Sequence, residues 1–239
     1  MKLLIALKGK ESLSDLRILK PGDERAMEEF LLPRIHSSMF LIGNSRICGL
    51  EDRGKPYQGT YAGVFEKNEI VAVAACYWSR IVVLQAPDHV EELVRIVLSV
   101  SGRPLKGLIG PTDQVAAAEN FLGLRNSGIQ LDSAEYLYSL DLNRIQVPEI
   151  AASGKVHCRK IEAGDIELLT EWEVRYRLEA LGEKENPQLR MQCREDMERL
   201  IQEKRAWILE SEGVPVARTA FNTVIKEAVQ VGGVWTPRN

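Results

Sequence analysis

The hydrophobic positions of this chain repeat one pattern in two places. In the first, a short apolar run from Arg17 reaches Gly22-Asp23, and apolar residues then recur at helical spacing: Met27, Phe30 and Leu31. In the second, a run from Arg159 reaches Gly164-Asp165, followed by Ile166, Leu169, Trp172 and Tyr176. Residues three or four apart share one helix face. Each stretch therefore predicts a short strand, a Gly-Asp corner and a helix, 142 residues apart (164 − 22).

A second pattern, alternation typical of β-hairpins, also occurs twice. Residues 60–66 and 70–78 flank a turn at Asn68, and residues 205–210 and 214–221 flank a turn at Gly213. Asn and Gly tolerate the positive φ that tight hairpin turns require. The two turns lie 145 residues apart (213 − 68), close to the first offset. Agreement between the two offsets predicts a duplicated domain.

A third strand follows each hairpin, over 80–87 and over 228–237, and the copies then diverge. The first copy is predicted to continue with four more elements: a helix over 88–98, a strand over 106–111, a helix over 114–122 and a strand over 135–141. A polar link over 143–154 carries Pro148 and Gly154. In the second copy a further helix is expected from Pro187, a favourable first-turn residue. The domains are therefore placed at 1–150 and 151–239.

Composition narrows the function classes. A net charge of −3 and a pI near 5.8 argue against nucleic acid or an anionic membrane as the main partner. No apolar run approaches the length of a membrane span, and the five-residue run near Met1 is too short for a signal peptide. The four cysteines lack a C-x-x-C pair, which favours reduced thiols in the cytoplasm, with Cys76 and Cys158 in contexts typical of buried thiols.

The order strand, helix, helix, hairpin and strand, with its Val-Trp-Thr-Pro exit, resembles the front part of a GNAT-superfamily N-acetyltransferase. The resemblance is carried by residues 39–44, 57–61 and 229–237. It implies an α/β (α+β) fold with mixed, mostly antiparallel sheets flanked by helices. It also implies a tandem arrangement in which the first domain is a degenerate copy and the second copy is incomplete.

The resemblance further implies a donor, acetyl-CoA, and a place for it. In the family, exposed backbone of the fourth strand pairs with the pantetheine arm, so the backbone of Val234, Trp235 and Thr236 is expected to face the cofactor. Gly232 and Gly233 suit this role, because glycine permits a bulge or a close backbone approach inside a strand. The alternative is a buried strand with a bulge and no ligand.

The chain departs from the family where the pyrophosphate is held. The family places a glycine-rich loop and a helix N-terminus after this strand, a general solution for anions. Here only Arg238 and Asn239 follow Pro237, and the second domain is expected to be cut before that loop. In the first half the equivalent position, residues 88–92, carries acids and no glycine, so it is expected to bind CoA poorly.

The pattern of residues leaves the catalytic groups unknown. Glu227, at the start of the fourth strand, is a candidate base, although strand-entry carboxylates are usually only solvated. Glu171, Glu173 and Tyr176 lie near where the family binds acceptors, while Trp172 and Tyr176 are also expected in the core. No metal-ligand spacing joins His36, His89 and His157, and no Gly-x-Ser-x-Gly elbow occurs.

Two hypotheses remain open. The first is an acetyltransferase acting on a primary amine or amino-terminal substrate, with no metal. The second is a non-catalytic module, derived from a GNAT domain, that binds a small molecule or a protein. In either case an open fourth-strand edge would favour association into a homo-oligomer, since unpaired strand edges recruit other strands.

Overall fold

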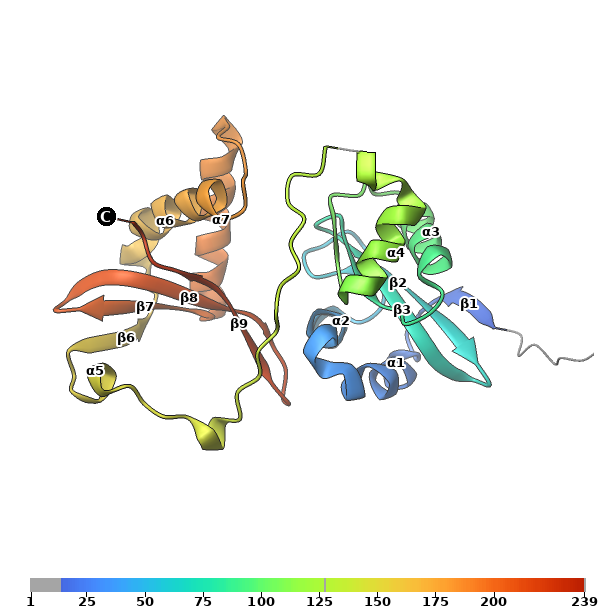
Figure 1. Cartoon of the computed structure of the whole chain (residues 1–239), viewed down its shortest axis with the longest axis horizontal. Helices are drawn as coiled ribbons and strands as arrows, with labels where there is room; N and C mark the ends of the chain where they lie inside the picture. The colour runs from blue at the N-terminus through green and yellow to red at the C-terminus, as the bar shows by residue number, and fades with distance from the viewer. Residues whose placement is uncertain (1–13, 127, 239) are drawn as a thin grey trace, which may run out of the picture. The chain divides into compact units, whose positions relative to one another are not determined.

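The chain forms two compact units, residues 1–127 and 128–239 (Figure 1). The computed structural model describes residues 14–126 and 128–238. Each unit is an antiparallel-rich sheet with helices, which confirms the α/β class with mixed, mostly antiparallel sheets flanked by helices. The domain boundary predicted after residue 150 lies inside the second unit. No helix in the described ranges is long and apolar enough to cross a membrane.

The first unit is built on a five-stranded sheet in the order β1-β2-β3-β4-β5. Neighbours are antiparallel except β4 and β5, which run parallel. The strands are β1 (Asp15–Ile18), β2 (Gly59–Glu66), β3 (Glu69–Tyr77), β4 (Ile81–Gln85) and β5 (Gly107–Ile109). The turn between β2 and β3 has positive φ at Lys67 and Asn68, as expected for a tight hairpin.

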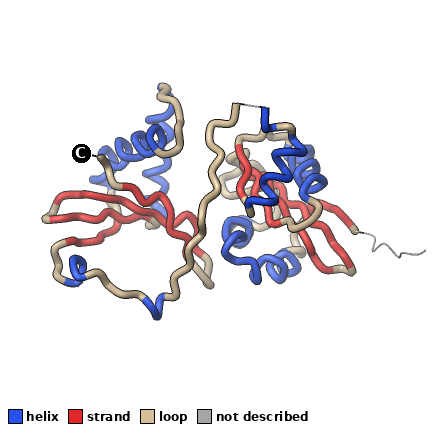
Figure 2. The backbone as a smooth tube through the Cα atoms, viewed as in Figure 1, coloured by secondary structure: helices blue, strands red, loops and turns tan. Residues whose placement is uncertain are grey.

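Helices cover both faces of this sheet (Figures 1 and 2). They are α1 (Glu24–Leu31), the short η1 (Leu32–Arg34), α2 (Ile35–Cys48), α3 (Val90–Ser101), α4 (Thr112–Leu122) and the short η2 (Leu124–Asn126). As predicted, Met27, Phe30 and Leu31 of α1 are buried. On the opposite face, Val90, Leu93, Val94 and Val97 of α3 pack on a layer of small apolar strand residues.

The second unit repeats the beginning of the first. Its antiparallel sheet has the order β6-β7-β8-β9, and its two long helices come between the first strand and the hairpin. The strands are β6 (Val156–Lys160), β7 (Ala206–Ser211), β8 (Val214–Val224) and β9 (Val229–Trp235). The helices are η3 (Leu142–Arg144), α5 (Glu149–Ala152), η4 (Ala163–Asp165), α6 (Ile166–Glu179) and α7 (Pro187–Glu203). Asn186 caps α7, accepting hydrogen bonds from the N–H groups of Gln188 and Leu189.

The two Gly-Asp corners are fixed by the same ion pair. Arg17 donates to both carboxylate oxygens of Asp23 at 2.7 and 2.8 Å, and Arg159 does the same to Asp165 at the same distances. In each corner the hydrogen bond from the arginine lowers the pKa of the aspartate. The repeat seen in the sequence is therefore also a repeat in the structure, with the same Arg–Asp pair at both Gly-Asp corners.

Two local predictions are wrong. Residues 135–141 form no strand, and their alternating apolar side chains are exposed, with Tyr136 86% and Tyr138 92% accessible. Strand propensity alone does not create a partner, and no described strand pairs with this segment. Cys158 is also exposed, because on β6 it points away from the helices, whereas Cys76 is buried as expected.

Candidate functional site

The edge strand β9 carries the most irregular backbone of the second sheet. It pairs with β8 alone, so its other edge has no partner strand among the described residues. Arg218 is opposite Trp235 and Ala220 is opposite Gly232, which leaves one extra residue on β9 between the two pairs. Gly233 sits in this bulge with φ +58°, a conformation that side-chain-bearing residues rarely adopt.

The neighbouring glycine is required for a different reason. A Cβ added to Gly232 would lie 2.1 Å from the Nδ2 atom of Asn222, a residue of β8. Asn222 is itself the extra residue of a second irregularity, between Phe221 and Thr223. The two glycines therefore permit the bulge and the close approach of β9 to β8, the two roles that the Gly-Gly pair indicated in the sequence.

The three residues expected to face a cofactor lie at the end of this bulge. Val234 is 67% exposed, Trp235 ends β9 and Thr236 is exposed just beyond it. The Trp235 ring packs edge-on against Trp172 of α6 with centroids 6.1 Å apart, and the Arg175 guanidinium lies 5.5 Å from its centre. Their assignment to a cofactor stays a prediction.

Behind the bulge lies a buried ion pair that the sequence pattern did not reveal. Glu173 of α6 and Arg218 of β8 are hydrogen-bonded, with side chains 10% and 5% exposed. Arg177 also donates to Glu173 at 2.8 Å and pairs with Asp196 of α7. A Cβ on Gly233 would lie 3.8 Å from an Arg218 nitrogen, so this charge adjoins the bulge.

Arg218 keeps one donor unused. Its Nε atom is buried and has no hydrogen-bond partner in the described part of the chain. Its guanidinium carbon lies 5.3 Å from the centre of the Tyr176 ring, which is half-buried. An unpaired buried donor is unfavourable for folding, so this arginine is a candidate for contact with a ligand carbonyl or anion.

In the first unit, apolar residues occupy the two positions that correspond to Glu173 and Arg218. Aligned on the Gly-Asp corners, Glu173 corresponds to Leu31 (173 − 142), and aligned on the hairpins, Arg218 corresponds to Val73 (218 − 145). Leu31 and Val73 are both fully buried. The fold therefore accommodates buried apolar residues at both positions, and it does not itself require the ion pair between Glu173 and Arg218.

Burial and the charges of this ion-pair group shift the pKa values of Arg177 and Cys193. Burial alone would lower the pKa of Arg177, but the hydrogen bond and charge of Glu173 outweigh burial and raise it. Burial raises the pKa of the Cys193 thiol to about 11, against the opposing charge of Arg177. The raised pKa and the burial of Cys193 both disfavour its thiolate at neutral pH.

The remaining candidates lie apart from the bulge. Glu171 is exposed and accepts from Arg190 at 2.7 Å. Glu227 lies in the bend before β9, with its carboxylate 3.6 Å from Lys226, at the opposite end of the strand from Gly233. Trp172 is confirmed as a core residue. Among the described residues, no group of three histidine, cysteine or acidic side chains could hold a metal.

In the first unit the equivalent position is the end of β4, where a backbone N–H group is already hydrogen-bonded within the chain. The buried side chain of Gln114 accepts from the N–H of Ala86 at 2.7 Å, so this backbone donor is taken. The first turn of α3 follows with Glu91 and Glu92, whose charges would repel a phosphate. The expectation that the first half makes a poor CoA site rests on these acids, and Gln114 adds a second obstacle.

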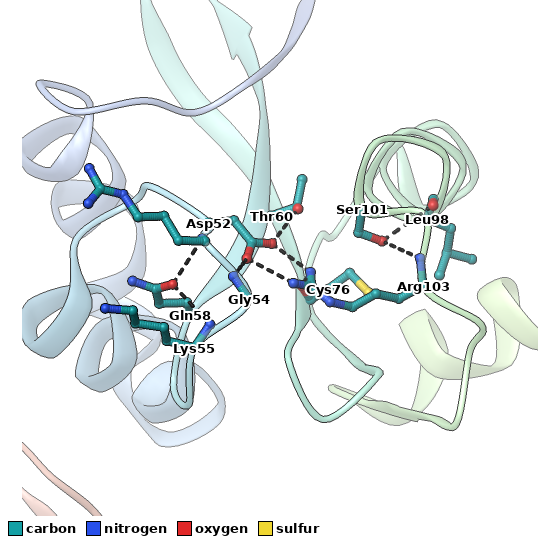
Figure 3. A network of polar contacts seen from close by, with 10 residues as sticks. Asp52, Gly54, Lys55, Gln58, Thr60, Cys76, Leu98, Ser101 and Arg103 are labelled. Carbon is teal, nitrogen blue, oxygen red and sulfur yellow. Dashed lines mark hydrogen bonds and ion pairs between the residues drawn. The ribbon is translucent and has the colours of Figure 1, made fainter.

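A separate polar network lies beside β2 and β3 of the first unit (Figure 3). Arg103 donates to both oxygens of Asp52, at 2.6 and 2.8 Å, and the hydroxyl of Thr60 donates to the same carboxylate at 2.7 Å. The Arg103 hydrogen bond lowers the pKa of Asp52 to about 2, against the opposing effect of burial. These residues line an open cleft of about 280 Å³. Because Arg103 and Asp52 satisfy one another, this network is structural.

Comparisons with known proteins find similarity at the level of structure. No family model matches the chain, and no curated protein matches it. Among solved structures, it is similar to an acetyltransferase of the GNAT family from Colwellia psychrerythraea. That similarity has a TM-score of 0.37 and 11% identity, and covers 91% of this chain and 76% of the other.

Proposed function

We propose that the chain is a tandem GNAT-type acyltransferase, in which β9 of the second unit binds the pantetheine arm of acetyl-CoA. The observation that carries the proposal is the edge position of β9 together with its glycine bulge. An edge strand offers free N–H and C=O groups, which an extended amide-bearing arm can pair with as a strand does. Val234, Trp235 and Thr236 supply that backbone.

The reaction is acetyl transfer to a primary amine or an amino terminus. The amine nitrogen attacks the thioester carbonyl carbon and loses a proton. The carbon–sulfur bond then breaks, and the thiolate of CoA leaves and takes up a proton. Donors aimed at the carbonyl oxygen would stabilise its developing negative charge. We assign no residue of this chain as base or acid.

The first unit acts as a supporting domain in this proposal. Its β4 end is occupied by Gln114, and its α3 begins with acids, which disfavours a second cofactor there. The repeated element order and the repeated Arg–Asp corner support a duplicated origin for the two units. The second unit differs in having the buried charge pair next to its bulge.

Isothermal titration with acetyl-CoA tests the proposal. We expect saturable binding to the full chain and weaker binding to Gly233→Ala, because the bulge needs a positive φ. Gly213→Ala is the matched control, since Gly213 has φ +77° in a hairpin turn with no atom near its Cβ position. Silence at millimolar ligand, or equal effects of both substitutions, would reject the assignment.

The second candidate is a non-catalytic module that associates through the same edge. The side of β9 that no described strand pairs with favours it, because strand addition would use the same backbone groups. Sedimentation at increasing protein concentration separates the two: self-association that acetyl-CoA does not reverse, without ligand binding, supports the module.

A further inference from the structure

The guanidinium of Arg218 lies next to the glycine bulge of β9. Arg218 is opposite Trp235 in the pairing of β8 with β9, and the bulged residue Gly233 lies two positions before Trp235. Among the described residues, the one atom that a Cβ on Gly233 would meet within 4 Å is Nη1 of Arg218, at 3.8 Å. The missing side chain of Gly233 therefore leaves a space that ends on this positive charge.

The rest of the unit satisfies Arg218 only in part. Its Nη2 atom donates to Glu173, but Glu173 also accepts from Arg177 at 2.8 Å, so one carboxylate serves two guanidinium groups. The Nε atom of Arg218 has no partner in the described part of the chain, although the side chain is only 5% exposed. A buried charge with an unused donor is unfavourable for folding, and a ligand oxygen beside the guanidinium would offset part of that cost.

The internal repeat shows that folding does not call for this charge. The first unit has Leu31 and Val73 at the positions of Glu173 and Arg218, and both are fully buried. The strand of that unit that corresponds to β9 is β4, whose sequence IVVLQ contains no glycine. The charged pair therefore occurs in the unit that has the glycine bulge and not in the unit that lacks it. This association favours a role for Arg218 in binding a ligand at the bulge.

We propose that Arg218 binds the thioester carbonyl oxygen of acetyl-CoA in the space beside Gly233. The proposal rests on the proposed function, in which Val234, Trp235 and Thr236 pair with the pantetheine arm. The resemblance to the GNAT family places the pyrophosphate beyond the end of this strand, so the arm runs back along β9 from there. Its thioester end then reaches the bulge, within range of the Nη1 atom of Arg218.

The positive charge of Arg218 suits the chemistry at that oxygen. As the amine nitrogen bonds to the carbonyl carbon, the π electron pair of the carbonyl moves onto the oxygen. The pair returns when the carbon–sulfur bond breaks and the thiolate leaves with the electrons of that bond. A fixed cation beside the oxygen therefore stabilises the transition state more than the ground state. Arg218 keeps its own proton throughout, so the proton that the amine loses and the thiolate gains does not pass through it.

Titration calorimetry of the full chain with two ligands tests the proposal. One ligand is acetyl-CoA, and the other is S-ethyl-CoA, in which a methylene group replaces the carbonyl. We expect acetyl-CoA to bind about tenfold more tightly, because a hydrogen bond to a charged group contributes on that order. The variant Glu173→Leu/Arg218→Val carries the apolar pair of the first unit and should bind the two ligands equally, with its affinity for S-ethyl-CoA unchanged.

Two further variants control for effects on folding. Glu171→Leu/Arg190→Leu is the matched control, because it removes a more than half-exposed ion pair between the same two helices and should keep the tenfold preference. Circular dichroism checks that each variant folds. If Glu173→Leu/Arg218→Val does not, Arg218→Lys replaces it, because lysine keeps the charge beside Glu173 but lacks the planar fork of donors, and it should also reduce the preference.

The possible results separate this inference from the proposed function. Equal binding of the two ligands by the unmodified chain, or a full preference in Glu173→Leu/Arg218→Val, would overturn the role of Arg218 and leave the proposed function standing. Loss of the preference in the control variant would also overturn it, since the effect would then not be specific to Arg218. Binding of neither ligand would reject the proposed function, and this inference with it.

Discussion

Replacing Glu173 by leucine tests whether the buried ion pair is required by the fold. The substitution leaves Arg218, 5% exposed, without its carboxylate partner and with its Nε atom already unpaired. Removing one partner of a buried pair costs about 3–5 kcal/mol, mostly because the other charge stays buried. We expect Glu173→Leu to lower the free energy of unfolding of the second unit by that amount.

The double variant Glu173→Leu/Arg218→Val carries the apolar pair of the first unit, Leu31 and Val73, at the matching positions. Apolar replacement of a buried ion pair is often neutral or stabilising by about 1–4 kcal/mol. We therefore expect the double variant to recover most of the loss. Glu171→Leu is the control on the same helix, because the Glu171–Arg190 pair is more than half exposed and should contribute well under about 1 kcal/mol.

Urea unfolding followed by tryptophan fluorescence measures this effect. Three of the four tryptophans, Trp172, Trp207 and Trp235, belong to the second unit, so the signal reports mainly on it. A loss below about 1 kcal/mol for Glu173→Leu would refute the reasoning. A double variant no more stable than the single variant would refute the comparison with the first unit.

Three further outcomes are expected. The pKa of Asp52 is about 2 in the folded chain against its usual 3.8, so its pairing with Arg103 contributes about 2 kcal/mol to the free energy of unfolding above pH 4. This contribution is lost as the pH falls towards 2, and Asp52→Asn should flatten that part of the acid-unfolding profile. Iodoacetamide at pH 7.5 should label exposed Cys158 before Cys193, which mass spectrometry of peptides resolves; equal rates would contradict the burial of Cys193. Gln114→Ala should cost about 1–3 kcal/mol in thermal unfolding by leaving a buried N–H at the end of β4 unpaired, and an unchanged midpoint would show that water replaces it.

The periodicities of the sequence predicted most of the elements. Met27, Phe30 and Leu31 are buried on α1, and Asn68 and Gly213 have the positive φ that their turns needed. These predictions succeed because helix faces and tight turns depend on residues close in sequence. The bulge of β9 was likewise readable, because adjacent glycines inside an apolar strand favour a bulge or a close backbone approach.

What the sequence could not show depends on pairing between distant segments. Glu173 and Arg218 are 45 residues apart, and only the position of β8 under α6 brings them together. The signal that could have found them was the repeat itself, which sets Glu173 against Leu31 and Arg218 against Val73. The exposure of Cys158 and the missing strand over 135–141 also depend on which neighbours a segment finds, not on its own alternation.

Hydrogen–deuterium exchange of the full chain with and without acetyl-CoA tests the central claim most directly. If the free edge of β9 pairs with the pantetheine arm, peptides covering residues 229–238 should exchange more slowly at saturating acetyl-CoA, while those covering β4 of the first unit should not change. Unchanged exchange across residues 229–238, with protection elsewhere or nowhere, would contradict the account.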